Sequence, residues 1–238
     1  MLVDKVDERY WSLMGRFEKA PELTIDVETT GLRIWHGDRI CGIAVYDGEV
    51  AAYFPFRHET SPNLPLERLE DFRRLVRDKT IINHNIKFDI EAMWVDGFPL
   101  PHRVEDSMLA AHLMNENEYK LDAQGRPIRR SGGHMATDYT LSSLAKKYLG
   151  QADSKDEMEQ IMKERGLTKS SLWRLPPELV APYAVGDVKL AKALRDFYVP
   201  YLKLWRLYDL WQEVNRYCII TAKMEIRGLQ LDRDRIRQ

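Results

Sequence analysis

Long apolar runs and closely spaced cysteines are both missing from this chain of 238 residues. No stretch approaches the ~20 consecutive apolar residues that a membrane-spanning helix needs. The two cysteines, Cys41 and Cys218, lie far apart and form no Cys-x-x-Cys pair, which argues against a disulfide framework and a zinc site. Residues 1–20 mix charged and apolar side chains, so they predict a short amphipathic helix and no secretory signal. We therefore expect a monomeric, cytoplasmic protein with no membrane partner.

A strong excess of charge of one sign is also absent. The formal net charge is -1, from 36 Lys and Arg residues and 37 Asp and Glu residues. Broad, non-specific binding of duplex nucleic acid usually goes with a basic excess, so the balance argues against that role. It does not exclude a site that holds a few nucleotides through metal ions. Basic clusters at 73–77, 126–130 and 146–147 are interpreted as solvated surfaces, and the six histidines show no metal-ligand spacing.

Residue patterning predicts an α/β domain with a mixed central sheet flanked by helices. A strand runs into a turn over residues 23–32, and Asp47-Gly48 is a hairpin signal between two further strands. We expect strands at 39–47, 50–56, 80–83 and 103–105, and helices at 66–76, 85–95, 106–114, 141–149 and 155–165. The stretch 115–140 is polar and lacks periodicity, so we expect a long, mobile surface loop there.

Prolines divide the C-terminal part of the sequence. The pair at 176–177 begins a short helix, and Pro182 begins another that runs to about residue 198. Pro200 then breaks the chain before a long helix over 202–226. A helix over the last seven residues is too short to be stable alone. We therefore expect the chain to be cut from a larger protein.

The first candidate for chemistry is the strand and turn at 23–32. Side chains alternate along a strand, so Asp26 and Glu28 point to one face and Ile25 and Val27 to the other. Two carboxylates on one face repel each other and are costly to desolvate, and a divalent cation between them removes both problems. The alternative is an acidic strand face that is simply solvated.

Two later segments carry further carboxylates. In the helix after Pro182, a core-facing stripe carries Asp187 one turn after Tyr183. A carboxylate on an apolar face needs a hydrogen-bonding partner or a metal ion. Asn85 and Asp89 also lie one helical turn apart, just after a strand, where the sites of α/β proteins form. Taken alone, this Asn would be a helix cap and this Asp a solvated residue.

In combination, these motifs are specific. Asp-x-Glu at 26–28, Asn-x-x-Phe-Asp at 85–89 and Tyr-x-x-x-Asp at 183–187 resemble the DEDDy branch of the 3′→5′ exonuclease superfamily, whose domains share the RNase H-like (DnaQ-like) fold. Further stretches look like the proofreading domain of bacterial and phage family A (DNA polymerase I-like) DNA polymerases, at 51–56, 105–109, 141–145 and 183–187. The resemblance departs at the stretch 115–140, which is longer than expected, and at Phe88, where Tyr is common.

The resemblance implies a site with two divalent cations, Mg²⁺ or Mn²⁺. Asp26 would bridge the two ions, Glu28 and Asp187 would bind the first, and Asp89 would serve the second through water. Tyr183 would hydrogen-bond and orient the attacking water. The product would be a nucleoside 5′-monophosphate released from the 3′ end of single-stranded DNA.

Four further residues would surround that 3′ end. Thr29 would contact the terminal nucleotide, and Leu32 would wedge against its base. Phe88 would stack or pack beside the base, and Asn85 would donate to a phosphate or hold Asp26. Packing in the hydrophobic core is an equal alternative for Leu32 and Phe88.

The resemblance also implies a division of the chain into two parts. Residues 1–200 would form the exonuclease domain, and residues 201–238 a long helix and the start of a polymerase module, acting in cis or in trans. Two alternatives remain open. A catalytically silent copy of the fold would only bind DNA or brace a polymerase module, and an RNase D-like enzyme would act on RNA. The intact carboxylates argue against the first, and the polymerase-like tail at 224–232 argues against the second.

Overall fold

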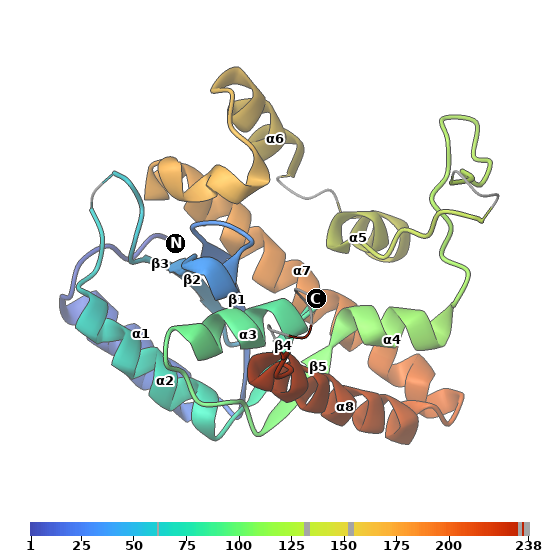
Figure 1. Cartoon of the computed structure of the whole chain (residues 1–238), viewed down its shortest axis with the longest axis horizontal. Helices are drawn as coiled ribbons and strands as arrows, with labels where there is room; N and C mark the ends of the chain where they lie inside the picture. Colours follow the sequence, from blue (N-terminus) through green and yellow to red (C-terminus); the bar gives the residue numbers. More distant parts are fainter. Residues whose placement is uncertain (61, 131–133, 152–154, 233–234, 236–238) are drawn as a thin grey trace.

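A five-stranded mixed sheet lies at the centre of the computed structural model, as the sequence predicts (Figure 1). The strand order is β3-β2-β1-β4-β5, with antiparallel β3-β2 and β2-β1 pairs and parallel β1-β4 and β4-β5 pairs. The strands are β1 (Glu22–Thr29), β2 (Ile40–Tyr46), β3 (Ala51–Pro55), β4 (Thr80–Asn83) and β5 (Arg103–Asp106). The structure describes residues 1–60, 62–130, 134–151, 155–232 and 235.

Helices cover both faces of this sheet (Figure 1). The α-helices are α1 (Glu8–Lys19), α2 (Leu69–Arg77), α3 (Lys87–Val95), α4 (Ser107–Met114), α5 (Leu141–Leu149), α6 (Lys155–Glu164), α7 (Pro177–Leu204) and α8 (Tyr208–Arg227). Three 3-10 turns join them, η1 (Ile34–His36), η2 (Leu66–Arg68) and η3 (Lys169–Arg174). The amphipathic N-terminal helix is confirmed as α1, where the Asp7 side chain caps the helix by accepting the backbone N–H of Tyr10 at 3.0 Å.

The pleat of β1 divides its side chains between two packing layers. Ile25 and Val27 join residues of α1, α2 and α3 in the main hydrophobic core. Asp26 pairs in register with Ala44 of β2, and Ala44 packs in a second core with residues of α7 such as Ala184. Because residues directly opposite each other share a face, Asp26 and Glu28 lie on the face that α7 crosses.

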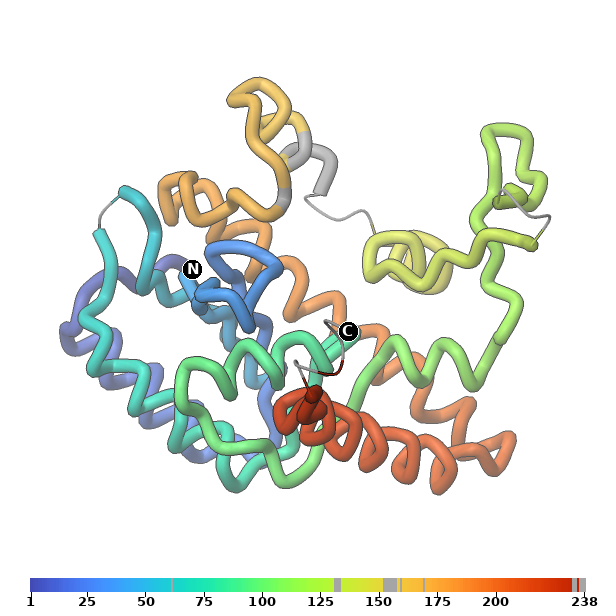
Figure 2. The backbone as a smooth tube through the Cα atoms, in the orientation of Figure 1, coloured from blue at the N-terminus to red at the C-terminus, as the bar shows by residue number. Residues whose placement is uncertain are grey.

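A third hydrophobic cluster joins α4, α5, α7 and the start of α8. Its largest buried side chains are Tyr198 of α7 and Trp211 of α8. The helix α8 also packs along β5 and α3, so it closes the sheet at that edge (Figure 2). The C-terminal helices are therefore built onto the α/β domain by buried apolar contacts.

The helix α7 is one continuous element of 28 residues, which corrects the prediction of separate helices and a break at Pro200. Each internal proline removes one backbone hydrogen bond and crowds the preceding turn. Tyr198 and Leu202 are fully buried on either side of Pro200, so their packing outweighs that cost. The chain instead turns at Arg206, which has a positive φ of 59°, and α8 starts at Tyr208 instead of near 202.

The described residues of the stretch 115–140 (115–130 and 134–140), here named the arm, project from the rest of the molecule (Figure 2). Three short segments of the arm pair with one another through backbone hydrogen bonds of 2.8 Å. Lys120 N–H donates to the Ala136 carbonyl, Ala136 N–H to the Ile128 carbonyl, and Ile128 N–H to the Lys120 carbonyl. The predicted long surface loop is present, with no helix or strand between α4 and α5 among the described residues. The sequence did not predict the backbone hydrogen bonds between its segments, because these bonds follow no apolar periodicity.

The remaining predictions for the chain ends and cysteines have mixed outcomes. Cys41 and Cys218 are free cysteines, as predicted. The Asp232 side chain accepts the backbone N–H of Arg235 at 3.1 Å, but most of the predicted final helix lies outside the described residues. Among the described helices, none combines the length and apolar character needed to cross a membrane.

Candidate active site

Strand β1 carries Asp26 and Glu28 on the face beneath α7, where both side chains are half-buried. Glu28 pairs in register with Gly42 of β2. A Cβ atom on Gly42 would lie 1.8 Å from the Tyr53 hydroxyl, so only glycine lets Tyr53 lie across β2 at this point. Burial, and then the charges of Cys41, Glu28 and Asp26, raise the pKa of Tyr53 well above its ordinary value. A protonated phenol is therefore placed beside the two carboxylates.

Asn83 at the end of β4 holds Asp26. Its Nδ2 donates to Asp26 Oδ1 at 3.0 Å, and the Asn83 side chain is only 2% exposed. The neighbouring parallel strands β1 and β4 bring the two residues together. This contact was not predicted, because Asn83 is not part of the Asn-x-x-Phe-Asp motif, although its place at a strand end was a usable signal.

Asp89 reaches the same region from the first turn of α3. Its Oδ1 accepts the backbone N–H of Val27 at 3.0 Å, so the carboxylate lies directly against β1. Asp89 is 5% exposed. Burial, and then the charge of Asp26, raise the pKa of Asp89 well above its ordinary value, with a smaller contribution from Glu28. The prediction of a solvated Asp, taken from this segment alone, is wrong.

Tyr183 and Asp187 approach from the opposite side, on α7. The side chain of Tyr183 is buried, and it hydrogen-bonds the Asp187 side chain one turn along the helix. Burial, and then the charges of Asp187, Glu28 and Asp26, raise the pKa of Tyr183 far above its ordinary value. The phenol therefore stays protonated and lies within electrostatic reach of carboxylates from both α7 and β1.

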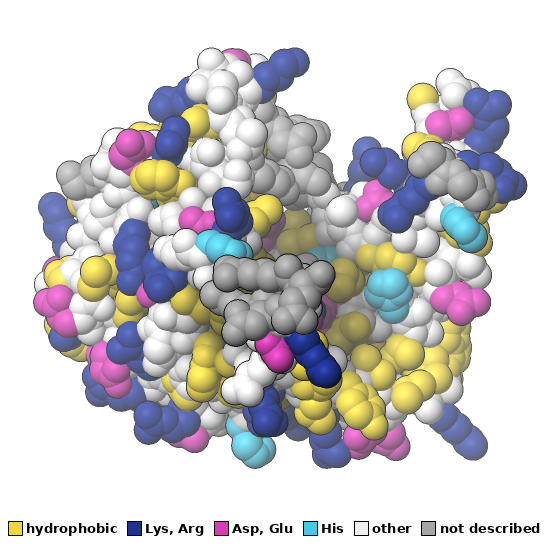
Figure 3. Space-filling view, in the orientation of Figure 1, with side chains coloured by type: hydrophobic (Ala, Val, Ile, Leu, Met, Phe, Trp, Pro, Cys, Tyr) yellow, Lys and Arg dark blue, Asp and Glu magenta, His cyan; other side chains and the backbone are white. Residues whose placement is uncertain are grey.

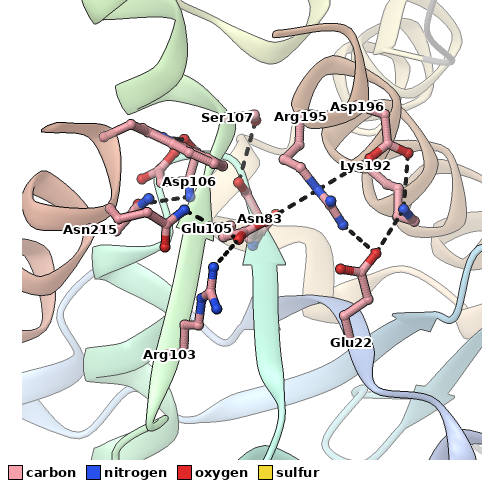
Figure 4. Close-up of polar contacts among 12 residues, drawn as sticks. Glu22, Asn83, Arg103, Glu105, Asp106, Ser107, Lys192, Arg195, Asp196 and Asn215 are labelled. Atoms are coloured by element: carbon pink, nitrogen blue, oxygen red, sulfur yellow. Dashed lines mark hydrogen bonds and ion pairs between the residues drawn. The ribbon is translucent and has the colours of Figure 1, made fainter. Parts of the chain in front are cut away.

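Ion pairs fasten α7 to the sheet close to these residues (Figure 4). Glu22 of β1 pairs with Lys192 at 3.0 Å and with Arg195, both on α7. Arg195 also pairs with Glu105 of β5 at 3.5 Å. Glu22 of β1 and Glu105 of β5 thus fix the position of α7, the helix that carries Tyr183.

Asp106 shapes the turn that precedes α3. Its Oδ1 accepts the backbone N–H groups of Asn85 at 2.9 Å and Met108 at 2.8 Å, and its Oδ2 accepts that of Ile86 at 3.0 Å. These bonds hold Asn85 at a positive φ of 61°. Asp106 is also the N-cap of α4, which agrees with the helix predicted to begin at residue 106, but its bonds to the turn before α3 were not predicted. Asn85 is exposed and does not cap α3, since Ile86 takes that position.

The other three predicted DNA contacts lie around the same end of the sheet. Thr29 is buried, and its hydroxyl donates to the Gly31 carbonyl at 2.6 Å, which shapes the turn after β1. Leu32, in that turn, is 69% exposed, so the core-packing alternative is wrong for this residue. Phe88 is half-buried and packs against the main core. Both alternatives for this residue, a contact with the terminal base and packing in the core, therefore stay open.

The four carboxylates supply only oxygen ligands, which suit Mg²⁺ and Mn²⁺ better than zinc. The charges of Asp26 and Glu28 raise the pKa of both Asp89 and Tyr183, after the effect of burial, so the local field is negative and favours a cation. Within the described ranges, no group of three or more His, Cys, Asp or Glu side chains already has the arrangement of a metal site. The residues suit divalent ions because they offer oxygen donors and negative charge. These two properties do not depend on the positions of the four carboxylates relative to one another.

The face of the molecule shown in Figure 3 is hollowed between the part that carries α6 and the part that carries α5 and the arm. Apolar side chains gather on the floor of this hollow (Figure 3).

Comparisons with known proteins identify the family. A family model described as a 3′-5′ exonuclease of DNA polymerase A matches residues 7–202. DNA polymerase DpoZ of Acinetobacter phage SH-Ab 15497 is 30% identical over 224 residues, which cover 90% of this chain and 32% of the phage protein. DNA polymerase I of Aquifex aeolicus is 30% identical over 107 residues, covering 45% of this chain and 16% of that protein. The chain therefore spans at most about a third of these relatives.

Solved structures with the same architecture include a nuclease in its apo form and Brucella melitensis NrnC with bound Mg²⁺. The first has a TM-score of 0.67 and 17% identity and covers 95% of this chain and 92% of its own. The second has a TM-score of 0.61 and 16% identity and covers 89% and 88%. Escherichia coli RNase D matches with a TM-score of 0.62 and 16% identity over 94% of this chain and 50% of its own. These structures confirm the RNase H-like fold, and the family match shows that the chain belongs to the 3′-5′ exonucleases of DNA polymerase A.

Proposed function

We propose that this domain removes nucleoside 5′-monophosphates from single-stranded or frayed 3′ ends of DNA and proofreads for a family A DNA polymerase. One observation carries the proposal. Asp89 contacts β1 directly through the Val27 N–H, and the pKa of Tyr183, raised first by burial and by Asp187, is raised further by Glu28 and Asp26 from across the α7–sheet interface. Acidic groups from three separate segments thus act on one another at one place.

Each side chain has a proposed role. Asp26, Glu28, Asp89 and Asp187 would hold two divalent cations, which when bound lower the pKa of a water molecule and stabilise charge on the departing 3′-oxygen. The Tyr183 hydroxyl keeps its proton because its pKa is raised, so it orients water and does not act as the base.

The terminal nucleotide would be held by residues at the end of β1 and the start of α3. The turn after Thr29 presents Leu32 to solvent, outside the hydrophobic core, where its side chain can contact a base. Phe88 offers an aromatic ring beside Asp89, and a ring contact tolerates any base. Asn85 is exposed at the tip of its turn and is proposed to donate to a phosphate.

We assign residues 1–200 to the exonuclease domain, and 201–238 to a helix and the start of a polymerase module. The polymerase names of the relatives support this partner, which would act in cis or in trans. Large apolar side chains exposed at the end of α7 and along α8 offer it a surface, namely Leu204, Trp205, Leu210, Tyr217 and Met224. Contacts of this kind would be buried in a complete polymerase.

The test is digestion of 5′-labelled single-stranded DNA with Mg²⁺, with Mn²⁺ and with a chelator. We expect a ladder that shortens from the 3′ end only with a divalent ion, and no ladder from Asp26→Ala or Asp187→Ala. Asp78→Ala, at an exposed site after α2, is the matched control and should retain activity. Intact DNA in both metals would overturn the nuclease proposal and leave the silent, DNA-binding alternative.

RNA is the second candidate substrate, because Escherichia coli RNase D shares the architecture. The sequence relatives are polymerases that make DNA, which favours DNA for this chain. Side-by-side digestion of DNA and RNA oligomers of one sequence decides between them. Faster removal of ribonucleotides would reverse the assignment.

A further inference from the structure

A groove of about 520 Å³ lies between the base of the arm and α5, outside the candidate active site. Its walls are polar and aliphatic, and three lysines line it, Lys120 from the arm and Lys146 and Lys147 from α5. Exposed arginines at 126, 129 and 130 continue the positive charge along the arm. Lys and Arg side chains gather on this part of the molecule in Figure 3.

Two acidic side chains also line the groove, and both are bonded to protein donors. Glu118 is buried and accepts hydrogen bonds from Tyr148 at 2.6 Å and Asn115 at 3.0 Å, in addition to an ion pair with Lys147. Burial alone raises the pKa of Glu118, but Lys147 and Tyr148 lower it overall, so Glu118 stays ionised and neutralises Lys147. The remaining lysines are therefore the available cations.

Asp138 is the second acid, and it accepts the hydroxyls of Thr140 and Ser143, each at 2.8 Å. Burial raises the pKa of Asp138, but the hydrogen bonds from Ser143 and Thr140 lower it overall, and the nearby charge of Lys120 adds to that lowering. In the part of the chain that the structure describes, neither Lys120 nor Lys146 forms an ion pair within 4.0 Å, and both are exposed. Two lysines thus face a groove whose acids are already satisfied.

The groove adjoins the candidate active site. Near the end of the arm, the Tyr139 carbonyl is hydrogen-bonded to His84 Nε2 at 2.7 Å, and His84 is next to Asn85. On the other side, Leu144 of α5 packs in one cluster with Leu190 of α7, one helical turn after Asp187. Residues of the groove walls and of the arm thus contact residues adjacent to Asn85 and Asp187.

We infer that this groove binds the phosphate backbone of the single strand that leads to the 3′ end, through Lys120 and Lys146. The inference rests on the proposed function and adds a second nucleic-acid contact outside the carboxylate site. Lysines act as point charges toward phosphates and read no bases, so the contact is independent of sequence. It predicts that strands long enough to reach the groove bind more tightly than a dinucleotide.

The experiment compares the wild-type chain with Lys120→Ala/Lys146→Ala. Fluorescence anisotropy in a chelator measures the binding of an oligonucleotide of about 12 nucleotides, within the usual size of single-strand sites. Each lost phosphate contact should reduce the slope of log K against log salt by about 0.7, so the double variant should lose about 1.4. Cleavage of a dinucleotide should keep its wild-type kcat/KM, while KM for the longer strand rises.

Lys19→Ala/Arg77→Ala is the matched control, with two exposed cations removed from α1 and α2, far from the groove in sequence. Its salt slope and KM should equal those of the wild type. A wild-type slope in Lys120→Ala/Lys146→Ala would overturn the groove assignment even if the enzyme cleaves DNA. Absence of all cleavage would overturn the proposed function, while a reduced slope in the chelator would still support the groove.

Discussion

Removing the side-chain amide of Asn83 is expected to weaken divalent-ion binding while the domain stays folded. In Asn83→Ala, the Asp26 carboxylate loses the Nδ2 donor that now lies 3.0 Å from its Oδ1. Asn83 is 2% exposed, so water does not readily replace that donor. A hydrogen bond to a charged group contributes about 1.5–3 kcal/mol to the arrangement it holds. This corresponds to about a ten- to hundredfold loss of ion affinity, the range found when a partner of a metal ligand is removed.

Calorimetric titration with Mn²⁺ measures the affinity directly, and thermal unfolding checks that the variant is folded. The half-saturating Mg²⁺ concentration for DNA cleavage should rise by the same factor. Ser107→Ala is the control, because Ser107 Oγ donates to the Asn83 carbonyl at 3.3 Å and acts on the strand end without removing the amide. Mn²⁺ affinity equal to wild type in a folded Asn83→Ala would refute the reasoning. Equal losses in both variants would also do so, since they would reflect general disturbance of β4.

Three further outcomes follow from side chains near the site and the second core. Tyr183→Phe should lower kcat in the exonuclease assay by about ten- to hundredfold, the loss expected for one hydrogen bond to a charged or polarised group; an unchanged kcat would remove Tyr183 from the mechanism. Leu32→Ala should raise KM for single-stranded DNA but change the free energy of unfolding by less than about 0.5 kcal/mol in urea, because the side chain is 69% exposed. Burial lowers the pKa of His58, whose ring nitrogens bond the Tyr53 hydroxyl and the Leu175 carbonyl. Since the unfolded chain then binds the proton more tightly, stability should be complete above about pH 6.5 and fall as the pH drops toward the lower folded pKa, and His58→Gln should flatten that fall.

Much of the sheet and of the site could be predicted from local rules. Strand alternation places Asp26 and Glu28 on one face, and the structure has them there. Helical spacing places Asp187 one turn from Tyr183, and the two side chains are hydrogen-bonded. These rules succeed because each depends on the geometry of a single element.

What the sequence could not supply depends on contacts between elements. The bond from Asn83 to Asp26 needs β4 to lie beside β1, and no local pattern states that neighbour. Pro200 would break an isolated helix, but buried residues on either side keep α7 intact. The arm is held by backbone hydrogen bonds between its own segments, which leave no periodic signal in the side chains.

The continuity of α7 has a mechanical consequence. At 1.5 Å per residue, 28 helical residues extend about 42 Å, with Tyr183 near one end and Leu204 at the other. Its ion pairs to Glu22 and Glu105 anchor the middle of this helix to the sheet, and buried packing keeps it continuous past Pro200. We therefore expect a partner that displaces the far end to tilt the helix about that anchor and to shift the Tyr183 hydroxyl relative to β1.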